Sequence, residues 1–129
     1  MKEVVVRKRV RKVNPWQRAK AKALVRRSPC GLYVGEIDRG VNFFVLMLEK
    51  LGLRTRYSCE GHPRGFYIVF DASYEDALKI HSVGFFKVEV VSCNIWSIRG
   101  DFDSERDKSK FLRHAAEQWE LAFGKLRFR

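Results

Sequence analysis

Four short segments rich in β-branched and aromatic residues constrain the fold more than any other feature of this sequence. They form two consecutive pairs, each joined by a few turn-forming residues: 54–59 with 66–70, and 86–91 with 95–99. Such pairs are typical of antiparallel hairpins. Between the pairs, Ser73 with Asp76 is a variant of the capping box, which predicts a short helix that ends near Gly84. The sequence therefore predicts two hairpins separated by a helix.

Two further apolar segments predict helices before and after the hairpins. Asp38 can cap a helix that runs to about Leu51, with Gly52 as its terminator, and Asp103 can cap a longer helix near the end of the chain. The expected buried residues of the first are Val41, Phe44, Val45, Leu48 and Leu51, with Phe43, Leu46 and Met47 beside them. Those of the last are Phe111, Ala115, Trp119, Ala122 and Phe123.

The predicted fold class is therefore α+β, an antiparallel sheet of about four strands with helices packed on one face. It becomes ferredoxin-like if Gly31–Glu36 adds a strand.

The N-terminal quarter of the chain differs from the rest in composition. Asn14 is a good N-cap and Pro15 suits the first helical position, so we expect a helix from there through Arg27. The sequence around Pro29 then breaks the regular pattern. We expect a basic arm and helix at 1–29 and a compact domain at 30–129.

The net charge of +11 is concentrated in the same quarter. Residues 1–29 contain 11 of the 26 Lys and Arg residues but only one acidic residue, Glu3. Such segregation favours a polyanionic partner, DNA or RNA, over a basic surface that only aids solubility. The candidate nucleic-acid-binding residues are Arg7, Lys8, Arg9, Arg11, Lys12, Trp16, Arg18, Lys20, Lys22, Arg26, Arg27, Arg54 and Arg56.

Period-2 alternation predicts which side chains share a face of the sheet. Thr55, Tyr57 and Cys59 share one face of the first strand, and its arginines lie on the other. Cations interleaved with rings would suit single-stranded nucleic acid. The open face is expected to carry Arg54, Arg56, Lys87, and either Tyr67 or Trp96.

The string RGFYIVF at 64–70 resembles the signature of the RNA recognition motif but lacks the small residue between its two aromatics. Phe66 and Tyr67 must therefore fall on opposite faces of the sheet. We interpret Phe66, Ile68 and Phe70 as core residues.

The string YSCEGHPRG at 57–65 leaves three interpretations open. Cys59 and His62 have a spacing compatible with half a zinc site, and with Glu60 they are the residue types of a thiol nucleophile and its base. The favoured interpretation is a rigid turn whose polar side chains can contact a partner. We expect no cofactor and no catalytic residue. The partner-binding candidates are Cys59, Glu60, His62 and Arg64.

The remaining composition bounds the class of protein. No apolar run is long enough to span a bilayer, and the apolar stripe of the basic helix is too thin to anchor it on a membrane. Three cysteines without a close framework favour free thiols. We expect a soluble cytoplasmic protein.

The run LGLRTRYSCEGHPRGFYIVF, followed by GFFKVEV and IWSIR, resembles small uncharacterised proteins of bacteriophages, prophages and mobile elements. They share an S-C-E-G-H-P turn followed by an F-Y-I-x-F strand, and the likeness covers about residues 35–123. The resemblance implies a host-cell context, with host takeover, DNA handling or inhibition of a host defence complex as roles. The leading hypothesis is a non-enzymatic nucleic-acid-binding protein. The alternatives are a protein-interaction module that inhibits a host complex, and a Cys/His zinc protein or enzyme.

Overall fold

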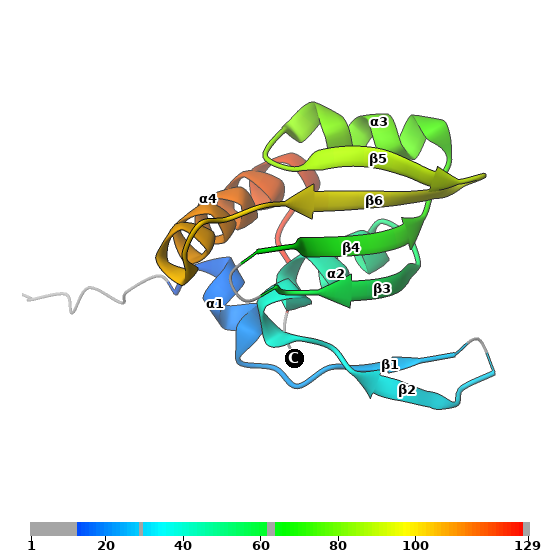
Figure 1. The fold of residues 1–129 in the computed structure, drawn as a ribbon, viewed down its shortest axis with the longest axis horizontal. Helices are drawn as coiled ribbons and strands as arrows, with labels where there is room; N and C mark the ends of the chain where they lie inside the picture. Colours follow the sequence, from blue (N-terminus) through cyan, green and yellow to red (C-terminus); the bar gives the residue numbers. More distant parts are fainter. Residues whose placement is uncertain (1–12, 29, 62–63, 128–129) are drawn as a thin grey trace, which may run out of the picture.

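The structure, a computed structural model, describes residues 13–28, 30–61 and 64–127 (Figure 1). The fold is α+β, as predicted from the sequence. Its elements are α1 (Pro15–Lys20), β1 (Val25–Arg27), β2 (Tyr33–Glu36), a 3-10 turn η1 (Arg39–Val41), α2 (Asn42–Lys50), β3 (Thr55–Cys59), β4 (Phe66–Asp71), α3 (Tyr74–Val83), β5 (Lys87–Ser92), β6 (Ile95–Gly100) and α4 (Glu105–Phe123).

The two predicted hairpins form one four-stranded antiparallel sheet with the order β3-β4-β6-β5. Because β6 separates β4 from β5, the α3 connection is a split βαβ crossover of the kind that defines a ferredoxin-like fold. The chain order of this unit is nevertheless ββαββα rather than βαββαβ. The strand at Tyr33–Glu36 does not complete a ferredoxin-like sheet, because it pairs only with β1 in a separate two-stranded sheet.

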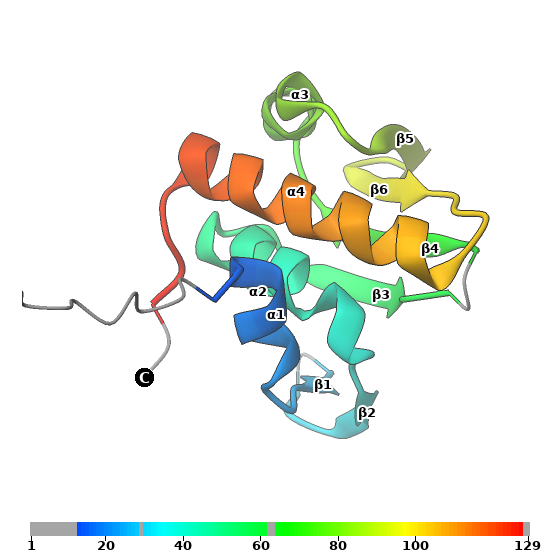
Figure 2. The same cartoon turned by 90° about the vertical axis from the view of Figure 1, so that its left-hand side faces the viewer.

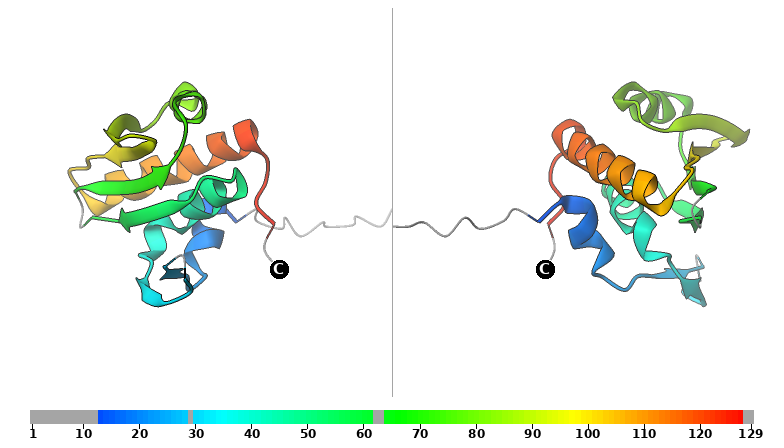
Figure 3. Two further views of the ribbon diagram at one scale, coloured as in Figure 1. Left: turned by 90° about the vertical axis from the view of Figure 1, so that its right-hand side faces the viewer. Right: turned by 60° about the vertical axis from the view of Figure 1, so that its left-hand side comes forward.

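Helices α2 and α4 cover one face of the four-stranded sheet, and α3 lies beside β5 (Figures 2 and 3). The alternation along β4 shows the same division. Phe66, Ile68 and Phe70 are buried on the helix side, as predicted, whereas Tyr67 and Val69 on the other side are only partly buried. No described helix covers that second face, which we call the open face.

An aromatic cluster fills the space between the helices and the sheet. The Phe44 ring makes edge-to-face contacts at centroid distances of 5.0 Å with Phe43, Phe86 and Trp119, and of 5.9 Å with Phe66. Edge-to-face pairs add to the stabilisation from apolar burial alone. The residues expected to face the core from α2 and α4 do so, with two exceptions at helix ends, Leu51 and Ala122.

Helix α1 is shorter than the sequence predicted. The prediction of a helix through Arg27 is wrong, because the helix ends at Lys20 and Val25–Arg27 is a strand. The Asn42 side-chain amide donates to the carbonyls of Ala19 and Lys22 at 3.0 and 2.6 Å, and so holds the chain in a turn directly after the helix. Backbone pairing with β2 then replaces helical hydrogen bonds.

The α1 helix is also part of the main core. Trp16 and Ala19 are buried in the same cluster as the residues of α2 and α4. Ser28, Cys30 and Gly31, where we expected a basic arm to separate from the body, belong to the β1–β2 connection, and the Ser28 amide donates to the Leu32 carbonyl at 2.8 Å. The last helix is capped by Ser104 rather than Asp103, since the Ser104 hydroxyl accepts from the Asp107 amide at 3.1 Å.

Candidate nucleic-acid interface

The β1–β2 hairpin extends below β3 in Figure 1 and is attached to the body through Arg26. The Arg26 guanidinium donates to Thr55 Oγ1 at 2.7 Å and to Ser58 Oγ at 2.8 Å. Burial lowers the pKa of Arg26, and the nearby carboxylate of Glu49 opposes that change. Arg26 therefore has a structural role in addition to its charge, because it fixes the hairpin against the edge strand of the large sheet.

Four of the predicted binding residues meet where the hairpin joins β3. They line a shallow hollow of about 170 Å³, and we call this region the arginine surface. The guanidinium of Arg27 donates to the carbonyl of Gly31 at 3.2 Å, and the guanidinium of Arg54 makes no hydrogen bond or ion pair with the described residues. These two exposed guanidinium groups are free to bind anions. The arginine surface consists of Arg26, Arg27, Arg54 and Arg56, together with Tyr57.

A β-bulge between Thr55 and Tyr57 changes the predicted faces of β3. Thr55 pairs with Phe70 and is buried on the helix side, whereas Tyr57 pairs with Val69 on the open face. The prediction that Thr55 and Tyr57 share a face is therefore wrong. The extra residue in the bulge is Arg56.

Arg56 reaches Asp71, which alternates with the buried residues of β4 and so lies on the open face. The hydrogen bond from Arg56 to the Asp71 carboxylate, with the charge of that carboxylate, raises the pKa of Arg56. Arg56 and Lys87 thus share the open face with Tyr67, as expected. Trp96 lies opposite Phe70, on the helix side.

The other predicted binding residues do not join the arginine surface. Arg7, Lys8, Arg9, Arg11 and Lys12 lie outside the described residues. Trp16 is only 3% exposed, and its indole nitrogen donates to the Gly40 carbonyl at 2.8 Å, so it packs in the core and does not stack on bases. Arg18 and Lys20 are exposed on α1, and the Lys20 ammonium lies 4.7 Å from the Trp16 ring centroid.

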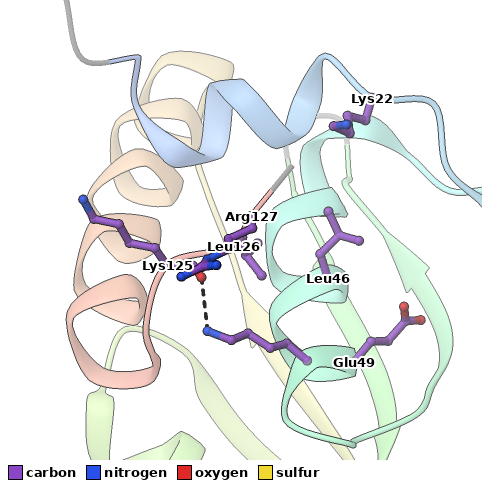
Figure 4. A pocket seen from close by; sticks show the side chains of 7 residues that line it. Lys22, Leu46, Glu49, Lys125, Leu126 and Arg127 are labelled. Atoms are coloured by element: carbon purple, nitrogen blue, oxygen red, sulfur yellow. Dashed lines mark hydrogen bonds between the residues drawn. The ribbon is translucent and has the colours of Figure 1, made fainter. Parts of the chain in front are cut away.

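A second basic hollow of about 950 Å³ lies between α2 and the segment after α4 (Figure 4). Lys50 donates to the carbonyls of Phe123 and Lys125 at 3.2 and 3.1 Å, and so stabilises the end of α4. Unlike the hollow at the arginine surface, this hollow is lined by a carboxylate, that of Glu49. Its lining residues are Lys22, Leu46, Glu49, Lys50, Lys125, Leu126 and Arg127.

A third basic region was missed from the sequence. Arg106, Lys110 and Arg113 are exposed on α4 and follow one another at four- and three-residue intervals, which places them on one side of the helix. This spacing is visible in the sequence. It is obscured by the acidic residues of the same helix, which bring the charge of the C-terminal part of the chain close to balance.

Glu60 and Gly61 of the predicted partner-binding turn face inward. Glu60 lies 3.5 Å from the ammonium of Lys108, a lysine of α4 that is only 1% exposed. The same ammonium donates to the Gly61 carbonyl at 2.9 Å and lies 2.8 Å from Glu105. We call Lys108, Glu60, Gly61 and Glu105 the lysine clamp. It joins the turn after β3 to the first turn of α4.

Two glycines make room for the lysine clamp. A Cβ on Gly40 would lie 2.3 Å from the Glu60 carboxylate, and a Cβ on Gly61 would lie 1.8 Å from the Arg64 carbonyl oxygen. Gly61 also has a positive φ of 71°, which disfavours other residues. The Glu60 amide donates to Asp38 at 3.0 Å. Glu60 and Gly61 therefore have structural roles in holding the turn after β3.

The other residues of that turn differ from Glu60. Arg64 is exposed and pairs with the exposed Asp103 at 3.3 Å, and Cys59 is partly buried. His62, with its predicted zinc or base role, lies outside the described residues. Within the described residues no group of three or more His, Cys, Asp or Glu side chains could hold a metal ion.

The apolar surface of the hairpin is unusually exposed. Leu32, Tyr33 and Val34 are each more than 60% exposed. Among the helices of residues 13–28, 30–61 and 64–127, none has both the length and the apolar character needed to cross a membrane. Neither a protein-family model nor any curated protein or solved structure matches this chain.

Proposed function

We propose that the protein binds nucleic acid without catalysing a reaction, and that the arginine surface contacts the phosphates. The observation that carries this proposal is the meeting of four arginines from two separate sheets around one hollow. Arginine is favoured at phosphate sites because its planar guanidinium can donate two parallel hydrogen bonds to one phosphate.

The partners of these arginines determine their separate contributions. Arg26 is held by Thr55 and Ser58, and Arg56 is paired with Asp71, so both bring charge with little freedom to reorient. Arg27 and Arg54 are exposed and have no carboxylate partner among the described residues, so we assign the direct phosphate contacts to them. The basic segment before residue 13 adds further phosphate contacts. The resemblance to phage and mobile-element proteins supports a role in the cytoplasm of a host cell.

A second candidate function is supported by the exposed apolar residues of the hairpin, Leu32, Tyr33 and Val34. Contiguous apolar surface is typical of sites that contact another protein. In this alternative, the hairpin inserts into a host complex, and the neighbouring arginines contact an acidic rim on that complex. A partner that stays bound after nuclease treatment and in high salt would favour this alternative.

A salt titration of nucleic-acid binding tests the leading proposal. The purified, nuclease-treated protein is titrated with labelled DNA and RNA oligonucleotides over a series of salt concentrations. Replacing Arg27 and Arg54 with Ala should weaken binding to all sequences alike and reduce the slope of log K against log salt by about 1.4–1.8, since each phosphate contact contributes about 0.7–0.9.

The matched control is the double variant Lys79→Ala/Lys110→Ala, which removes the same charge from α3 and α4. It should change binding much less than the arginine variant. Equal losses in the two variants would show a diffuse charge effect and contradict the arginine surface as the site. An additional variant measures how much the segment before residue 13 contributes to nucleic-acid affinity. It has Ala at Arg7, Lys8, Arg9, Arg11 and Lys12.

A further inference from the structure

The open face of the four-stranded sheet is continuous with the arginine surface. The strand register places Cys59, Tyr67, Arg99 and Lys87 in one row across β3, β4, β6 and β5. The neighbouring row begins with Tyr57, which also lines the arginine hollow. A ligand bound at the arginines therefore meets Tyr57 at the entrance to the open face.

The two tyrosines are suited to contact successive flat groups. Tyr57 is 64% exposed, and Tyr67 lies diagonally across from it, because Tyr57 pairs with Val69, two residues away in β4. Diagonal neighbours on antiparallel strands are about 7–8 Å apart. The guanidinium of Arg99 lies 5.8 Å from the Tyr67 ring centroid, so a cation stands next to this ring on the open face.

Most other charges of the open face are already paired. Lys87 lies 3.3 Å from Glu89, and Arg56 is bonded to Asp71. The face is therefore aromatic with a small positive excess, in contrast to the arginine surface beside it. A duplex, whose bases are stacked on one another, gains little from such a surface, whereas a single strand can place its bases on the rings.

We propose that the nucleic acid bound by this protein is single-stranded, with its phosphates at the arginine surface and two of its bases stacked on Tyr57 and Tyr67. This inference rests on the proposed function, because it assumes that the arginines bind a nucleic acid. Arg99 follows Tyr67 in the row of residues across the sheet, where it neutralises the phosphates beyond the second base. Stacking on rings is tolerant of sequence, so little sequence preference is expected.

The test compares a single-stranded oligonucleotide with a blunt duplex that contains the same sequence. Replacing Tyr57 and Tyr67 with Ala should weaken single-strand binding by at least about 30-fold, since two stacking contacts are lost. Duplex binding should change by less than about threefold, because the arginines are intact. The control variant Tyr57→Phe/Tyr67→Phe keeps both rings and should bind single strands almost as tightly as the natural protein.

The single variant Tyr57→Ala guards against a folding defect, because this exposed side chain contributes little to the core. It should weaken single-strand binding and leave the thermal transition unchanged. Unchanged single-strand affinity in the Ala variants, or tighter binding of the duplex by the natural protein, would overturn the single-strand inference. The Arg27→Ala/Arg54→Ala variant separates the two proposals. If this variant loses binding while the tyrosine variants bind normally, the protein binds nucleic acid through the arginines, and only the proposed stacking is wrong.

Discussion

The lysine clamp and the arginine surface contain similar residues but use them in opposite ways. In the lysine clamp, one buried cation contacts two carboxylates and a backbone carbonyl. At the arginine surface, four cations meet around a hollow, and within the described part of the chain only Arg56 has a carboxylate partner at hydrogen-bonding distance. The lysine clamp neutralises its positive charge inside the fold, whereas the arginine surface leaves positive charge available for a ligand.

This difference shows that a cluster of polar residues in the sequence is not necessarily a contact surface in the fold. The string S-C-E-G looks like a contact surface in the sequence, yet its glutamate and glycine hold two elements together. The arginines come from segments that look unrelated in the sequence, yet four of them line one hollow. Three substitutions measure how far the two regions differ.

Replacing Lys108 with Met should have the largest effect on stability. The Met side chain keeps most of the volume but leaves Glu60 and the Gly61 carbonyl without their buried partner. Removing one member of a buried ion pair typically costs about 3–5 kcal/mol. Urea unfolding should show that loss as a lower midpoint. Lys110→Met, two residues away and exposed, should change stability by less than about 0.5 kcal/mol; equal effects of the two would contradict the lysine clamp.

Replacing Gly61 with Ala should lower stability by about 2–5 kcal/mol, because the strain of a positive φ adds to the close approach of the new Cβ to the Arg64 carbonyl oxygen, at 1.8 Å. Gly65 is the matched control. It has a similar φ of 81° but nothing within 4 Å of its Cβ position, so Gly65→Ala should cost only the backbone strain of about 1–2 kcal/mol. Thermal unfolding of both variants makes the comparison. Similar losses would mean that backbone conformation, not the close approach, restricts Gly61.

Replacing Arg26 with Met should have a smaller effect, about 1–2 kcal/mol, since two hydrogen bonds to hydroxyl groups are lost. The loss should be local. Amide hydrogen exchange should become faster in Val25–Arg27 and Tyr33–Glu36 and stay unchanged in β4 and β6. The neighbouring variant Arg27→Met should leave exchange in the hairpin almost unaffected. Uniformly faster exchange over the whole sheet would contradict a local attachment by Arg26.

The regular part of the fold could be predicted from the sequence because local signals agree there with tertiary packing. The alternation in 66–70 gives the buried face of β4 correctly, and Ser73 caps α3 as expected. The N-terminal helix was predicted too long because its end depends on Asn42, a residue more than twenty positions away. Helix propensity carries no information about such a distant hydrogen bond.

The candidate site was predictable in its residue types and only partly in its arrangement. Alternation placed Tyr67 and Lys87 on the open face, but the bulge at Arg56 inverted the expected position of Thr55. A bulge shifts parity without changing composition, so no pattern count detects it. The burial of Lys108 could not be predicted from the sequence for a similar reason. A lysine near the start of an amphipathic helix is ordinarily exposed, and its burial depends on a turn nearly fifty residues earlier.

The packing of α4 also constrains how the protein is made. This last helix supplies Trp119 to the aromatic cluster and Lys108 to the turn after β3, so neither the cluster nor the turn is complete without it. During synthesis, the apolar faces of α2 and the sheet therefore stay uncovered until residues 105–123 have left the ribosome. Folding of the core therefore has to wait for the synthesis of α4, and chains that stop before α4 are expected to be captured by chaperones or degraded.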